Sequence, residues 1–192
     1  MIGKAIYAGL MVGIGVSANL MLENPILGAL LFSLALLVIM HNQLYLYTGK
    51  IGYFNFTKEQ SKILVLGLLF NFIGCLFTVS MNCGDPTYIA EISRAAALKF
   101  EPSAIQLFIE AFFCGILMFT AVNSKKTIIT VFCIMTFILL GYEHCVADFP
   151  FLYFVLSFEN IIKFLLIILG NTIGSIFIHF LVKEKENGKK RL

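Results

Sequence analysis

The sequence predicts an all-α integral membrane protein whose six transmembrane helices form two inverted three-helix repeats, with the second and fifth helices broken. Three observations predict this fold class: the composition, the length of the apolar runs, and a motif that recurs in both halves. Of the 192 residues, 59% are hydrophobic and 13% are charged, and the mean hydropathy is +0.92. Soluble globular domains do not have this composition, so a bilayer is the expected solvent.

The apolar runs give the expected spans. They lie near residues 4–22, 26–40, 63–81, 104–122, 127–142 and 161–182. Two further apolar stretches, 44–56 and 147–158, are too short to cross a bilayer alone and are typical of the second halves of broken helices. Lys4 precedes the first span and no small-residue cleavage site follows it, so this span is expected to be a retained helix rather than a signal peptide.

The basic residues predict the orientation. Three of the 14, Arg94, Lys99 and Lys163, would lie outside and the other 11 inside, as the positive-inside rule requires for a multi-pass plasma-membrane protein with both termini in the cytoplasm. The orientation in the membrane therefore accounts for the basic residues and the net charge of +3, which indicates no nucleic-acid partner. We expect one channel domain over residues 1–182, with halves of about 1–85 and 104–182, and a basic cytoplasmic tail over 183–192.

The five cysteines contain no C-x-x-C pair, and four of them lie in or beside apolar runs, where a thiol packs as a small hydrophobic group. They predict neither a disulfide nor a metal site, and no cofactor is expected. These residues are Cys75, Cys83, Cys114, Cys133 and Cys145.

An internal repeat links the two halves. Residues 71–77 and 171–177 both fit N-x-I-G-x-x-F, and residues 5–10 correspond in the same order to residues 111–116. Three spans per half is an odd number, so the second copy would enter the membrane from the opposite side, as in channels and transporters. Short Gly and Asn matches also arise by chance where small residues serve helix packing. Two matches in register, each beside a polar break, favour the repeat.

Polar residues interrupt the second and fifth spans, at residues 41–50 and 141–150. An unpaired ion is costly to bury in an apolar medium, so Glu143, His144 and Asp148 should face protein, water or a permeating solute. In an inverted repeat such breaks meet near the midplane, where their free backbone groups line the pathway.

These segments resemble the formate/nitrite transporter family, channels for small monovalent anions. Residues 46–49, L-Y-T-G, look like the family's L-F-T-G loop, and residues 141–147 look like its G-F-E-H-x-x-A segment. Residues 170–174 are similar to its G-N-x-x-G, and residues 28–32 resemble the approach to its first constriction. The likeness covers nearly the whole chain, and it implies an aquaporin-like architecture and a homopentamer with one pore per subunit.

The resemblance implies a substrate pathway. Thr48 and His144 would face one another at the pore centre, and Lys99 would lie on the extracellular approach. Two apolar constrictions would flank the centre, with Phe32 and Phe137 outside and Leu36 and Leu46 inside.

Several positions depart from the family pattern, so selectivity does not transfer. Gly115, which we also count with the pathway, stands where many members carry a pore Asn. Tyr45 replaces an acidic residue, and Asp148 with Phe149 replaces Asn-Met. Compared with the family pattern, the chain is also expected to lack the N-terminal cytoplasmic extension, so gating by such a segment does not transfer.

An anion that crosses an apolar constriction must have its charge compensated or neutralised. His144 has the chemistry for either, because an unperturbed imidazole has a pKa of about 6.5 and a Thr48 hydroxyl beside it donates or accepts. More ordinary roles remain open: a backbone-bonded histidine, a helix-capping Thr48 and a loop charge at Lys99. Glu143 is expected to satisfy backbone donors of the break.

The function expected is a channel, or a proton-coupled transporter, for a small monovalent anion such as formate or nitrite. Hydrosulfide, lactate and acetate are alternative substrates within the family. A membrane-embedded substrate-binding subunit of a vitamin importer is an alternative of another class. No H-E-x-x-H motif, Ser-Lys pair or Asp-Asp pair lies within a predicted helix, so an enzyme is not expected.

Overall fold

The computed structural model describes the backbone of residues 1–189 and the side chains of residues 1–183, and within this part of the chain it is all-helical. Of the predicted tail over 183–192, the backbone of residues 183–189 continues α9, whereas the side chains from 184 onward and residues 190–192 lie outside the described part. The elements are α1 (Ile2–Met21), α2 (Pro25–His41), α3 (Tyr47–Lys50), the 3-10 turn η1 (Ile51–Tyr53), α4 (Lys58–Asn82), α5 (Pro86–Lys99), α6 (Ala104–Ser124), α7 (Thr127–Leu139), α8 (Cys145–Phe154) and α9 (Phe158–Lys189).

Side-chain caps set several helix starts. The Asn24 side chain accepts hydrogen bonds from the backbone N–H groups of Ile26 and Leu27, and Pro25 fills the first position of α2. The pair Asp85 and Pro86 begins α5 in the same way. Proline suits this position because its missing N–H would have no partner there, and an oxygen at the N-cap satisfies a donor that the helix leaves free.

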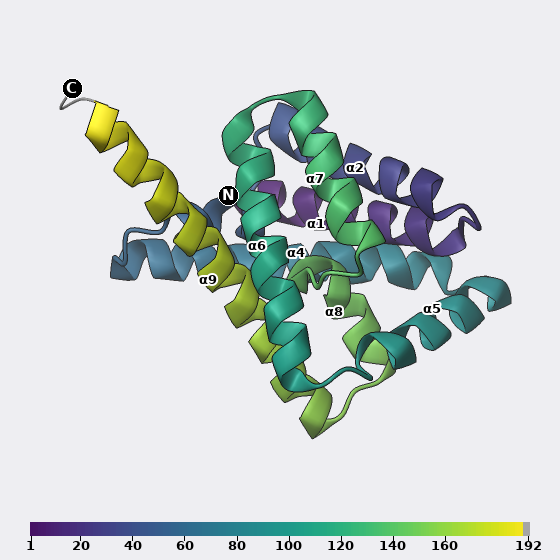
Figure 1. Ribbon diagram of the computed structural model, residues 1–192. Coiled ribbons are helices and arrows are strands. Elements are labelled where there is room, and N and C mark those ends of the chain that lie inside the picture. Colours follow the sequence, from purple (N-terminus) through teal and green to yellow (C-terminus); the bar gives the residue numbers. More distant parts are fainter. Residues whose placement is uncertain (190–192) are drawn as a thin grey trace.

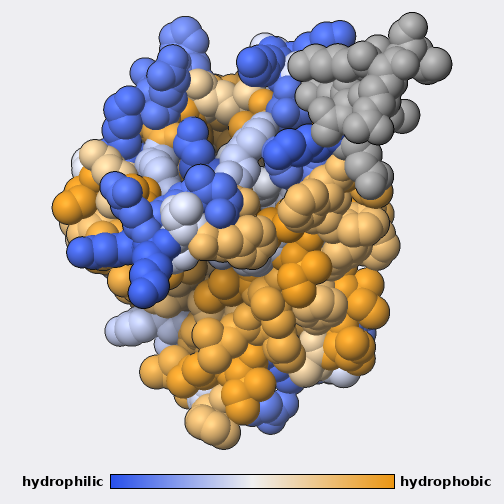
Figure 2. Space-filling model, turned by 90° about the vertical axis from the view of Figure 1, so that its left-hand side faces the viewer, coloured by the Kyte–Doolittle hydropathy of each residue, from blue (hydrophilic) through white to orange (hydrophobic). Residues whose placement is uncertain are grey.

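The molecule presents an apolar exterior, which confirms the predicted membrane protein. By length and composition α1, α4, α6 and α9 are each long and apolar enough to cross a bilayer, whereas α2, α7 and α8 are shorter. Figure 2 shows a broad hydrophobic surface over the lower right of the view and hydrophilic residues gathered at its top and left. Bulky apolar side chains such as Leu34, Phe77 and Leu165 are exposed, as expected of a molecule that faces lipid or other apolar partners.

Two helix pairs form the frame of the fold: α1 packs along α4, and α6 packs along α9. Glycines allow both crossings. A Cβ added at Gly9 would overlap the carbonyl oxygen of Asn71, and one added at Gly74 would overlap that of Ile6. The second pair repeats this contact, because a Cβ at Gly174 would overlap the carbonyl oxygen of Phe112. Backbones this close exclude any larger residue.

Both interrupted helices break where polar residues predict a break. The helix α2 ends at His41 and α3 begins at Tyr47, while α7 ends at Leu139 and α8 begins at Cys145. The helix α7 therefore ends three residues before the end of the predicted range of 127–142. The sequence pattern does not predict α5, which joins α4 to α6 and packs on α8 (Figure 1). Through its contacts with α1, α4, α5 and α9, α8 brings the second break into the middle of the molecule.

Candidate functional site

Asn71 of α4 holds the first break. Its amide Nδ2 donates to the carbonyl oxygens of Ala5 and Tyr45, both at 2.8 Å, and its Oδ1 accepts from the backbone N–H of Tyr47, also at 2.8 Å. The side chain is fully buried, so these bonds replace the water that the broken backbone would otherwise need. One side chain thus ties α1, the break and α4 together.

Asn171 of α9 does the same for the second break. Its Nδ2 donates to the carbonyl oxygens of Ala111 and Glu143 at 2.8 Å, and its Oδ1 accepts from the N–H of Cys145 at 2.9 Å. The repeated motif contains both asparagines, but the sequence analysis gives them no role. Their position could have indicated one, because a buried amide inside an apolar helix must find polar partners, and a helix break offers them.

Thr48 and His144 meet across the two breaks. Thr48 Oγ1 lies 2.9 Å from His144 Nε2, and both side chains are buried. His144 Nδ1 accepts from the backbone N–H of Ala147 at 3.2 Å and so caps α8. Because Nδ1 accepts, the neutral imidazole carries its hydrogen on Nε2, which donates to the Thr48 hydroxyl. Thr48 makes no capping bond in α3, so its own hydroxyl hydrogen is available to another acceptor.

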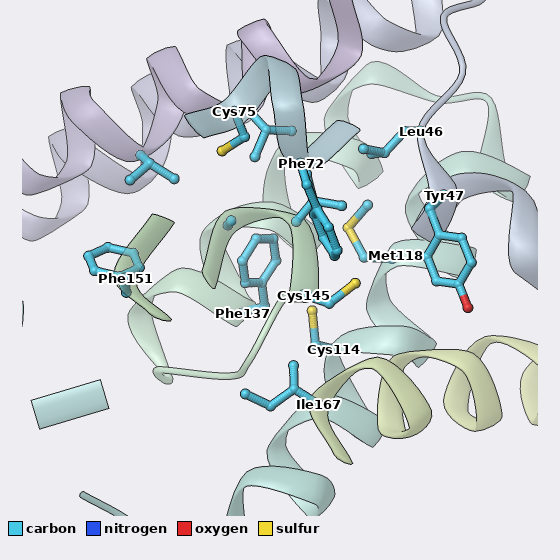
Figure 3. Packing of buried hydrophobic residues seen from close by; sticks show 14 of the residues in the cluster. Leu46, Tyr47, Phe72, Cys75, Cys114, Met118, Phe137, Cys145, Phe151 and Ile167 are labelled. Carbon is cyan, nitrogen blue, oxygen red and sulfur yellow. The ribbon is translucent and has the colours of Figure 1, made fainter. Parts of the chain in front are cut away.

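Apolar packing surrounds this pair. Figure 3 shows part of the buried hydrophobic cluster, which takes in the chain neighbours Tyr47 and Cys145 of the pair and brings together side chains from five elements: Tyr47, Phe72, Met118, Cys145 and Ile167, from α3, α4, α6, α8 and α9 respectively. The Phe137 ring lies nearly parallel to the His144 imidazole, with the ring centroids 5.6 Å apart and the planes at 22°. The hydrogen bond between Thr48 and His144 therefore lies in a low-dielectric setting, where it is stronger than in water.

Two cavities are lined by residues of the two break segments. The first, the Lys99 cavity, has a volume of about 480 Å³ and is lined by Lys99 together with Phe32 and Phe137, whose rings meet edge to face at 5.8 Å. The second, the Lys50 cavity, has a volume of about 400 Å³ and is lined by Lys50 with Leu36 and Leu46. Neither the Thr48 nor the His144 side chain lines either cavity, but their chain neighbours do: Glu143 and Ala147 line the first, and Leu46 and Gly49 line the second.

Lys99 lies within a cluster of charges on the wall of its cavity. Its Nζ is 2.7 Å from Glu143 Oε2 and 3.1 Å from Asp148 Oδ1. The Glu143 carboxylate thus pairs with a lysine instead of with the backbone donors that the sequence suggested, although its backbone carbonyl accepts from Asn171.

The sequence model for formate/nitrite transporters matches residues 1–184. This chain belongs to the formate/nitrite transporter family. The membership makes it a transport protein and not an enzyme, and it excludes the vitamin-importer subunit. No curated protein matches the sequence.

Solved structures share the fold of this formate/nitrite transporter. A protein described as an FNT family ion channel superposes with a TM-score of 0.83 at 22% identity, over 96% of this chain and 89% of the other. A pentameric formate channel with formate bound superposes with a TM-score of 0.80 at 18% identity, over 96% of both chains. At these identities the likeness shows the fold.

Two positions in the transporter have surroundings that the sequence does not indicate. Lys163 of α9 donates from Nζ to the carbonyl oxygen of Phe100 at 2.8 Å and pairs with Glu159 at 2.8 Å, which anchors the end of α5 next to Lys99. Gly115 lies where α6 crosses α9: a Cβ there would overlap the carbonyl oxygen of Asn171, and Gly115 lines neither cavity. Its surroundings are those of a packing position rather than of a pathway.

Proposed function

We propose that this transporter conducts small monovalent anions such as formate or nitrite through a central site formed by Thr48 and His144. The observation that carries the proposal is the 2.9 Å contact between Thr48 Oγ1 and His144 Nε2, made across the two helix breaks. The similar pentameric channel that holds formate supports a monocarboxylate as the substrate.

The pair acts as a relay of hydrogen-bond donors. His144 Nε2–H donates to the Thr48 hydroxyl, which donates in turn to an oxygen of the anion at the midpoint of the pathway. A donor chain of this kind is polarised along its length, so the terminal hydroxyl binds negative charge more strongly than an isolated threonine would. To gain a proton at Nδ1, His144 would have to give up the Ala147 N–H bond that caps α8. The geometry therefore favours a neutral donor over an imidazole that changes charge.

The apolar constrictions serve as filters on either side of this relay. Phe32 and Phe137 close the Lys99 cavity, and Leu36 and Leu46 close the Lys50 cavity. A hydrated ion loses water molecules at such apolar constrictions, and the Thr48 hydroxyl replaces some of the lost hydrogen bonds. Lys50 and Lys125 in the second cavity attract the anion before that step, whereas Lys99 in the first is paired with Glu143 and Asp148, so the charge that the anion meets there depends on these carboxyls.

The topology proposed is six spans in two inverted repeats within one domain over residues 1–182, with halves of about 1–85 and 104–182. In it α2 with α3 forms the second span, and α7 with α8 the fifth. The equal bonding of Asn71 and Asn171 and the matching glycine crossings support the repeat. The distribution of basic residues supports a plasma-membrane protein with cytoplasmic termini, and the pentameric relative together with the exposed apolar faces supports a homopentamer.

Anion uptake into proteoliposomes tests the proposal. Wild type, His144→Ala and protein-free vesicles are compared with formate, nitrite, acetate, lactate and hydrosulfide at about pH 5.5 and 7.5, on either side of the roughly 6.5 pKa of a free imidazole. Formate or nitrite flux well above the protein-free leak, reduced in His144→Ala by a similar factor at both pH values, supports the neutral relay. His41→Ala, which removes an exposed histidine at the end of α2, is the matched control.

Two results would contradict this. Absence of formate and nitrite flux would reject these anions, and flux of another anion would then name the substrate. A deficit in His144→Ala that changes several-fold between the two pH values would show that the imidazole itself titrates.

A further inference from the structure

The Lys99 cavity contains an unbalanced set of buried charges. One ammonium, Lys99, contacts two carboxyl groups, and the Glu143 and Asp148 side chains are only 4% and 2% exposed. The second oxygen of Asp148, Oδ2, is buried and makes no hydrogen bond to any residue that the structure describes. With both carboxyls ionised, the cluster would carry one net negative charge beside the route of an anion.

The extra carboxyl is a feature of this chain. Asp148 stands at the position where the family pattern has an asparagine, and an amide there would leave Lys99 and Glu143 as a neutral pair. Both carboxyls touch the same Nζ, which places them within the roughly 6 Å over which like charges disfavour simultaneous ionisation. A single proton removes the excess charge and the repulsion together.

No neighbouring group among the described residues supplies a second positive charge. The Nδ1 of His144 is occupied by the Ala147 N–H, and Lys163 is paired with Glu159 and the Phe100 carbonyl. On the α1 side the cavity is lined by uncharged residues, Val16, Asn19 and Leu20. The remaining titratable neighbours add no positive charge: they are Cys75 on α4, Cys114 and Glu110 on α6, and Cys145 on α8.

We propose that Glu143 and Asp148 form a proton-binding site beside Lys99, in which the two carboxyls share one proton at neutral pH. When the proton is bound the cluster is neutral and the Lys99 cavity admits anions. When the proton leaves to water, both carboxyls are ionised and the cavity carries a negative charge that opposes their approach. The existence of the site does not depend on the transport proposal, whereas its effect on flux rests on it.

Infrared spectroscopy of the reconstituted full-length protein tests the site directly. A protonated carboxyl gives a C=O stretching band that ionised carboxylates lack, and this band shifts in heavy water. Wild type is expected to show the band at neutral pH and to lose it as the pH is raised. Asp148→Asn and Glu143→Gln, which each leave one carboxylate facing Lys99, should both lack it. Glu110→Gln, which alters a half-buried carboxyl in the same cavity, should retain it.

Formate flux measured on the same samples tests the effect. As the pH rises from neutral to about 9, well above the roughly 4 of a free carboxyl, wild type should lose several-fold more flux than Asp148→Asn. Absence of the band in wild type, or an unchanged band in both Asp148→Asn and Glu143→Gln, would overturn the proposal. A band that behaves as expected, in protein that carries no anion, would leave the proton site standing and reject the transport function instead. Elution volume and circular dichroism show whether each variant is folded.

Discussion

Asn71 and Asn171 bond the two helix breaks in the same way, each donating to two carbonyl oxygens and accepting from one N–H at the start of the following short helix. One carbonyl in each set belongs to the helix that crosses nearby, Ala5 in α1 and Ala111 in α6. Each of the two helix breaks is therefore held by the side-chain amide of one asparagine.

Replacing either asparagine with leucine should destabilise the protein severely. Three backbone groups would lose their partners at a buried site, and each buried unsatisfied group costs about 1–3 kcal/mol. Thermal unfolding in detergent should show a similar fall in midpoint for Asn71→Leu and Asn171→Leu. Asn123→Leu, at an exposed position, is the control and should change little. Wild-type stability in either buried variant would show that the break does not depend on the amide.

Alanine at Gly174 should also be destabilising. The new Cβ would overlap the Phe112 carbonyl oxygen, so α6 and α9 would have to separate, and overpacking of this kind typically costs about 1–3 kcal/mol. Gly3→Ala makes the same chemical change where no atom lies within 4 Å, and it should leave stability unchanged or slightly higher. Equal unfolding midpoints for the two variants would argue against a close crossing.

Thr48→Val should lower formate flux while Thr48→Ser preserves it. Valine has nearly the shape of threonine but no hydroxyl, so it removes the last donor of the relay. A lost buried hydrogen bond is worth about 1–3 kcal/mol, and about 1.4 kcal/mol corresponds to a factor of ten in rate. We therefore expect a decrease of roughly tenfold or more in proteoliposome uptake. Equal flux in Thr48→Val and Thr48→Ser would exclude a hydroxyl relay.

Lys163→Met should loosen the end of α5. The carbonyl oxygen of Phe100 would lose its ammonium partner, and Lys99, one residue earlier, would be held less firmly over its cavity. Hydrogen exchange should become faster for amides near the carboxyl end of α5 and remain unchanged in α1. The exposed Lys62→Met serves as control. If exchange in α5 is unaffected, Glu159 and Lys163 form a surface pair of no structural consequence.

Much of the architecture can be predicted from the sequence, because in a bilayer the length and polarity of an apolar run set what it does. The broken helices follow from polar residues inside such runs, and the positions of Thr48 and His144 follow from the resemblance of the break segments to a known family. In contrast, α5 escapes prediction because charged residues such as Glu91 and Arg94 make it too polar for a membrane span, although its Asp85-Pro86 start is a helix signal that could have found it.

The charge pairing in the Lys99 cavity could not be predicted either. Lys99, Glu143 and Asp148 belong to different elements, and their contact depends on how α5 packs against α8. The packing role of Gly115 likewise requires the crossing of α6 and α9. The spacing of residues along the chain indicates where a helix forms, but it does not indicate which distant segments come into contact.

The asparagine bonds also imply an order of assembly during synthesis. The chain emerges from its amino end, so the first break is made well before Asn71 follows it on α4, and the second waits for Asn171 on α9. Until then their backbone groups must find temporary partners in water, in the translocation machinery or in neighbouring helices. The second break is thus held in its final geometry only after α9, the last described helix, has entered the membrane.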